Sequence, residues 1–143
     1  MSQKLYNQTV FKLISEQIER MHGGYLAKQD GELGIEIEVE GQGLPVGVDN
    51  VTRYWRDEKD NSLRGESREY ILTKPIAKAY IAEAIAELKA LFASNKARII
   101  DSMNTSVHVH LNCQKLTFRQ LATLAVTYYC LEHLLMEYCG EER

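Results

Sequence analysis

The sequence is poor in the residues that build disulfide frameworks and thiolate metal sites. Its three cysteines, Cys113, Cys130 and Cys139, are odd in number, and no pair of them has CxxC spacing. This usage argues against a disulfide scaffold and against a cysteine zinc site. We therefore expect a protein that works in a reducing cytoplasm.

Long apolar runs and a strong excess of one charge are also absent. The longest apolar run is far below the ~20 residues that a membrane span needs, and the N-terminal MSQKLYNQTV lacks the apolar centre of a signal peptide. Lys and Arg number 17 against 20 Asp and Glu, which gives a net charge of −3 without a basic stripe. We expect neither a membrane nor a nucleic acid as partner.

The chain contains only two prolines and nine glycines in 143 residues, and no stretch is typical of a linker or a repeat. That length is sufficient for one domain with one core. We predict a single domain over 1–143, in which an N-terminal helix and lead-in occupy 1–30 and the core portion occupies 31–143.

The spacing of apolar residues predicts three helices and four strands. The helices are expected over 8–22, from Pro75 at a first helical position, and from Thr117, where Thr117 and Gln120 have capping-box spacing. The strands are expected over 33–40, 51–58, 66–72 and 105–112. Short early connections favour antiparallel pairing, and amphipathic helices need a cover. The prediction is an α+β fold, an antiparallel sheet with helices on its apolar face and the other face open.

The stretch GIEIEVEG, residues 34–41, alternates apolar and acidic residues without a break. As a strand it would present Glu36, Glu38 and Glu40 on one face. A solvated outer face is the simpler interpretation. However, glutamates in line repel one another and have poor strand propensity, whereas hard cations such as Mg²⁺ or Mn²⁺ favour a row of carboxylates.

A second polar face lies on SVHVHLN, where His108 and His110 share one parity with Ser106 and Asn112. Imidazole is a common metal ligand and an acid–base group near neutral pH, although a solvated face with two histidines remains open as an interpretation. Taken together, Glu36, Glu38 and the two histidines would gather on the open sheet face. A mixed Glu and His set without cysteine suits an open Mg²⁺ or Mn²⁺ site.

Several short motifs, in order, resemble those of the amidoligase family over residues 33–143. They are GIEIEVEG, LP, YW, D-x-SLRG, EYIL-x-x-P, TSVHVHLN and YYCLEHLL. Amidoligases are carboxylate–amine ligases, often encoded by bacteriophages, with a glutamine synthetase-like fold. The resemblance implies an antiparallel sheet that holds Mg²⁺ (or Mn²⁺) and ATP on its concave face, with helices behind it.

The resemblance also implies roles for individual residues. The implied metal ligands are Glu36, Glu38, Glu69 and His108. The implied catalytic residues are Glu69, His108 and Arg64, and the implied cofactor-binding residues are His110, Arg68 and Ser62. Whether the two histidines contact metal or phosphate stays open.

The implied chemistry joins a small-molecule or peptide carboxylate to an amine through an acyl phosphate. Complete family members are expected to continue beyond the position of Glu142 and Arg143. The resemblance therefore predicts an N-terminal portion of the enzyme, completed by a second chain or in a homo-oligomer, in a host cytoplasm where the chain is phage-encoded.

Two other functions fit the same residues. A non-catalytic phage assembly or structural protein could keep the fold, and the closing helix favours this because it has more apolar residues than one buried stripe needs. A metal-dependent hydrolase built on His108, His110 and a carboxylate is the third hypothesis, which zinc bound by both histidines would favour.

Overall fold

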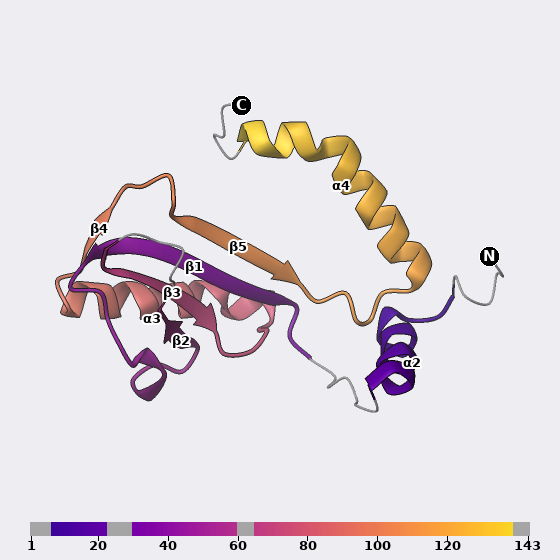
Figure 1. The fold of residues 1–143 in the computed structure, drawn as a ribbon, viewed down its shortest axis with the longest axis horizontal. Helices are drawn as coiled ribbons and strands as arrows, with labels where there is room; N and C mark the ends of the chain where they lie inside the picture. Colours follow the sequence, from indigo (N-terminus) through magenta and orange to yellow (C-terminus); the bar gives the residue numbers. More distant parts are fainter. Residues whose placement is uncertain (1–6, 23–29, 60–64, 139–143) are drawn as a thin grey trace. The chain divides into compact units, whose positions relative to one another are not determined.

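The computed structural model describes residues 7–22, 30–59 and 65–138, and the chain divides into two compact units. One unit is Gln29–Asn112, and the other combines Met1–Lys28 with Cys113–Arg143. Each is described by itself. The fold class is α+β, with an antiparallel sheet and α-helices, as the sequence predicts (Figure 1).

A five-stranded antiparallel sheet forms the first unit. Its strands are β1 (Leu33–Gln42), β2 (Trp55–Glu58), β3 (Ser67–Leu72), β4 (Arg98–Ile100) and β5 (Ser106–Leu111). The order is β2-β3-β1-β4, and β5 also pairs with β1. Glu38 of β1 is opposite Glu69 of β3 and also opposite Ser106 of β5, so β3 and β5 lie along opposite edges of β1.

The apolar parity of β1 faces helix α3 (Ile81–Ser94), which covers that side of the sheet (Figure 1). Ala84 and Leu88 of α3 are buried in one cluster with Ile35 and Val39 of β1. Trp55 of β2 is fully buried in the same cluster, and its indole Nε1 donates to the carbonyl of Ala84 at 2.8 Å. The indole therefore joins the sheet to the helix by both packing and a satisfied buried donor.

The loop before β2 is fastened to the core side of the sheet by a buried carboxylate. Asp57 accepts the backbone N–H of Val48 at 2.8 Å with one oxygen, and Arg68 Nη1 lies 2.7 Å from the other. The hydroxyl of Tyr70, also buried, donates to the carbonyl of Pro45 at 2.9 Å. These contacts use the polar groups that this face of the sheet would otherwise leave unpaired.

Two predicted boundaries are wrong, for identifiable reasons. The helix predicted from Pro75 begins at Ile81, after the short 3₁₀ helix η2 (Lys78–Tyr80), because Ile76 instead exchanges backbone hydrogen bonds with Leu33 of β1 at 2.8 and 3.0 Å. The second strand begins at Trp55, because Val51 and Thr52 donate their backbone N–H groups to the carbonyl of Val48 in the 3₁₀ helix η1 (Val48–Asn50), at 3.0 and 2.8 Å. The short strand β4 had no counterpart in the prediction.

The second unit contains α2 (Val10–His22) and α4 (Phe118–Tyr138). Their N-terminal ends are joined, since the N–H of Val10 donates to the carbonyl of Leu116 at 2.7 Å and that of Phe118 to Gln8 at 2.9 Å. The capping box is confirmed: the Gln120 N–H donates to Thr117 Oγ1 at 3.2 Å, and the Thr117 N–H to Gln120 Oε1 at 2.8 Å. No described helix is both long enough and apolar enough to cross a bilayer.

The buried indole provides a test of the core. Replacing Trp55 by Ala should lower the free energy of unfolding by about 3–5 kcal/mol, because it leaves a cavity and removes the indole hydrogen bond to the carbonyl of Ala84. Val51→Ala, at a side chain 70% exposed in the adjacent loop, should change it by no more than about 0.5 kcal/mol. Urea unfolding of both variants measures the difference, and similar small effects would contradict this core.

Candidate functional site

Strand register brings the acidic residues and histidines that were predicted to share a face onto one side of the sheet. Glu36 of β1 is directly opposite His108 of β5, and Glu38 lies between Glu69 of β3 and Ser106 of β5. Residues directly opposite in an antiparallel pair point to the same side, with Cβ atoms about 4.5–5.5 Å apart. We call this surface the acid–histidine face. Its defining residues are Glu36, Glu38, Glu69, Ser106, His108 and His110.

Glu36 is the point where the two histidines meet. Its Oε2 lies 3.2 Å from His110 Nε2 and 3.4 Å from His108 Nδ1. Partial burial alone would raise the pKa of Glu36, but hydrogen bonds and charge attraction from His110, and then from His108, outweigh it and lower the pKa. The ionised form of Glu36 is therefore the one that this face stabilises.

A second line of contacts runs from His108 to Glu38. Nε2 of His108 lies 2.9 Å from Ser106 Oγ, and the Ser106 hydroxyl donates a hydrogen bond to Glu38 Oε2. Together with the Glu36 contact this makes a continuous relay of four residues, Glu36–His108–Ser106–Glu38. The prediction from parity included Ser106 on this face but gave it no role.

A row of three carboxylates crosses the sheet perpendicular to the strands. Glu58 of β2 is opposite Glu69 of β3, and Glu69 is opposite Glu38 of β1. Like charges directly opposite one another destabilise a sheet. Glu58 was missed by sequence reasoning, because its place in the row follows only from the register of β2 against β3.

Arg56 brings a positive charge to this side of the sheet. It shares parity with Glu58, and its Nη2 lies 3.2 Å from Glu58 Oε1, with both side chains about half exposed. In the next cross-strand row Ile71 separates it from Glu36. Parity within β2 could have found Arg56, but the sequence gave no reason to single it out.

One predicted site residue, Arg68, is not brought to this face. Arg68 is opposite Val39 on the core side, where its guanidinium pairs with Asp57 at 2.7 Å. We therefore withdraw Arg68 from the nucleotide-binding set, since a phosphate would have to compete with a buried ion pair from the wrong side of the sheet. Ser62 and Arg64 lie outside the described residues.

The donor chemistry of the acid–histidine face fits a hard divalent cation. Carboxylate oxygens are what Mg²⁺ and Mn²⁺ prefer, and imidazole is compatible with Mn²⁺. Among the described residues no three His, Cys, Asp or Glu side chains stand as a ready-made metal set. Glu36 is turned toward the histidines, and Glu38 toward Ser106. A cation would therefore bind by displacing these partners.

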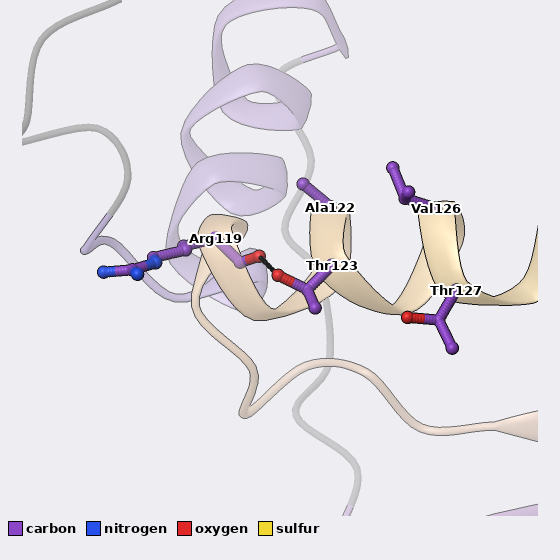
Figure 2. Close-up of a pocket in the computed structure, with 5 residues that line it drawn as sticks. All are labelled: Arg119, Ala122, Thr123, Val126 and Thr127. Carbon is purple, nitrogen blue, oxygen red and sulfur yellow. Dashed lines mark hydrogen bonds between the residues drawn. The ribbon is translucent and has the colours of Figure 1, made fainter.

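A hollow of about 340 Å³ lies on α4. It belongs to the second unit, whereas the acid–histidine face belongs to the first. Figure 2 shows that its side chains diverge from one helix instead of converging on a centre, and the Thr123 hydroxyl is turned back to the carbonyl of Arg119 at 2.9 Å. The described residues that line it carry no carboxylate or imidazole; they are Arg119, Ala122, Thr123, Val126 and Thr127. It is surface relief rather than a site for the predicted chemistry.

Comparison with known proteins gives no identification, because no family model, no curated protein and no solved structure matches the chain. Function must therefore be inferred from the residues of the acid–histidine face and their contacts.

The lowered pKa of Glu36 can be measured directly. The NMR signal of its carboxyl carbon should report a pKa below the ordinary value of 4.5. Because ionised Glu36 is favoured in the folded state, the associated stability is present above the unfolded pKa and is lost as the pH falls through the lowered folded pKa. His110→Gln should raise the NMR midpoint more than His108→Gln, since His110 is the larger cause. Identical midpoints in all three proteins would contradict the contacts.

Proposed function

We propose that this protein is an ATP- and Mg²⁺-dependent carboxylate–amine ligase, with the acid–histidine face as its metal-holding surface. The observation that carries the proposal is the in-register row Glu58–Glu69–Glu38. Aligned carboxylates repel one another, and a bound cation would relieve that repulsion. The order of the motifs supports the ligase class and a glutamine synthetase-like arrangement.

The proposed metal donors are Glu36, Glu38 and Glu69, joined by a histidine. Mn²⁺ could take the place of Mg²⁺, since both favour carboxylate oxygens. A metal bound there would supply charge neutralisation for the ATP phosphates during phosphoryl transfer. Arg56 brings a positive charge to this side of the sheet, and we assign it the attraction of the anionic nucleotide.

The remaining steps fall to the side chains of the chain itself. The amine that attacks the acyl phosphate must lose a proton, and we assign its acceptance to Glu69, whose carboxylate is central in the row. The carboxylate and amine substrates are small molecules or peptides. We further propose a cytoplasmic setting, that of the host where the chain is phage-encoded, with the site completed by a second chain or another copy.

Metal binding tests the proposal first. Calorimetric titration with Mn²⁺ should give measurable affinity in the wild-type chain, and the Glu38→Gln, Glu69→Gln double variant should lose at least about tenfold. Glu83→Gln is the matched control, because Glu83 on α3 forms an exposed ion pair, with Arg53 at 3.2 Å. ATP should then bind only with metal present. No metal binding in the wild type, alone or with a completing chain, would overturn the proposal.

The row of carboxylates also makes a prediction about stability. Saturating Mg²⁺ should raise the free energy of unfolding of the wild type more than that of Glu69→Gln, since the wild type gains from ion binding and the variant loses a ligand. Urea unfolding of both proteins with and without Mg²⁺ measures the difference. Equal effects of Mg²⁺ on the two proteins would argue for an ordinary solvated face.

A second candidate is an assembly role without catalysis, and α4 favours it. No residue of this 21-residue helix is buried in the described structure. Its large apolar side chains include Tyr129 at 79% and Tyr138 at 89% exposure. Exposed apolar surface of this extent is typical of an interaction site. A stable complex without nucleotide affinity, unaffected by the double Glu variant, would favour assembly over ligation.

A further inference from the structure

We propose that Ser106 is a positioning residue that locks Glu38 and His108 into the relay of the acid–histidine face. The inference deepens the proposed function and rests on it for its role in metal binding, although the relay itself can be tested without metal. Ser106 has no part in the roles that the motif resemblance implies.

The contacts of Ser106 reach both neighbours at once. It is directly opposite Glu38 across the β1–β5 pair, and its hydroxyl donates to Glu38 Oε2. Two residues along β5, on the same side, His108 Nε2 lies 2.9 Å from the same hydroxyl oxygen. One small side chain therefore bridges a carboxylate of β1 and an imidazole of β5.

The number of donors and acceptors available fixes the direction of each hydrogen bond in the bridge. A serine hydroxyl has one proton, and an ionised carboxylate only accepts, so the proton of Ser106 is directed to Glu38. His108 Nε2 must then donate to Ser106 Oγ, and in the protonated imidazolium form Nδ1–H also donates toward Glu36 Oε2, 3.4 Å away. Both ring nitrogens of His108 are thereby occupied within the relay.

This occupation changes the expected division of labour between the histidines. His108 could ligate a cation only after one of its two contacts breaks, whereas His110 uses Nε2 alone in its contact with Glu36 at 3.2 Å. We assign the metal-ligand role to His110 and a supporting role to His108. Ser106 sets the orientation of both His108 and Glu38, as hydrogen-bonded outer groups do at metal sites generally.

The first readout is nuclear magnetic resonance of the metal-free full chain at one fixed pH. In Ser106→Ala the ¹⁵N signal of His108 Nε2 should shift, and Ser106→Thr should restore it, because threonine keeps the hydroxyl. Ser94→Ala is the control, since Ser94 also donates locally, to the Leu91 carbonyl at 2.8 Å on α3. A His108 signal that does not change in Ser106→Ala would overturn the relay.

The second readout is Mn²⁺ affinity of the same four proteins. Ser106→Ala should bind about tenfold more weakly than the wild type, and Ser106→Thr and Ser94→Ala should bind like the wild type. Equal affinity of Ser106→Ala and wild type would overturn the positioning role. If the wild type binds no Mn²⁺ but the His108 signal still shifts in Ser106→Ala, the proposed function is overturned and the relay remains supported.

Discussion

The pairing of β1 along both of its edges is the constraint on which the rest of the first unit depends. Its alternation sends Ile35 and Val39 into the core under α3, and Glu36 and Glu38 to the other side. Because a strand has a period of two, a slip of one residue would expose the apolar set and bury the acidic one. The hydrophobic core therefore fixes the position of the acid–histidine face.

Parity was enough to predict this face, while the contacts within it needed register. Alternation in two separate segments assigned Glu36, Glu38, His108 and His110 to one side, and the structure agrees. Alternation alone cannot say which residue stands opposite which, since that depends on turn lengths and on how strands align. The row through Glu58 and the relay through Ser106 are products of register.

The errors of the sequence-based prediction have similar physical causes. Arg68 was taken as a nucleotide contact although its parity is that of Tyr70, and the structure directs it to Asp57 on the core side. For Arg68 the prediction rested on the motif resemblance, although the alternation of β3 placed this residue on the core side. Pro75 suggested a helix start, but local preference yielded to the pairing of Ile76 with β1. In both cases a long-range contact decided the outcome.

Several carboxylates on this side of the sheet already have partners, and this bears on how the acid–histidine face is used. The histidines and Ser106 satisfy Glu36 and Glu38 from β5, while Arg56 approaches Glu58 from the same strand, β2. An external cation must therefore replace existing partners instead of filling an empty cage. Such competition lowers affinity but leaves the carboxylates oriented beforehand, which reduces the ordering that binding requires.

The side of β5 away from this face is exposed within its unit, with Val107 at 62%. The histidine half of the face consequently relies on the hydrogen bonds between β1 and β5 more than on packing.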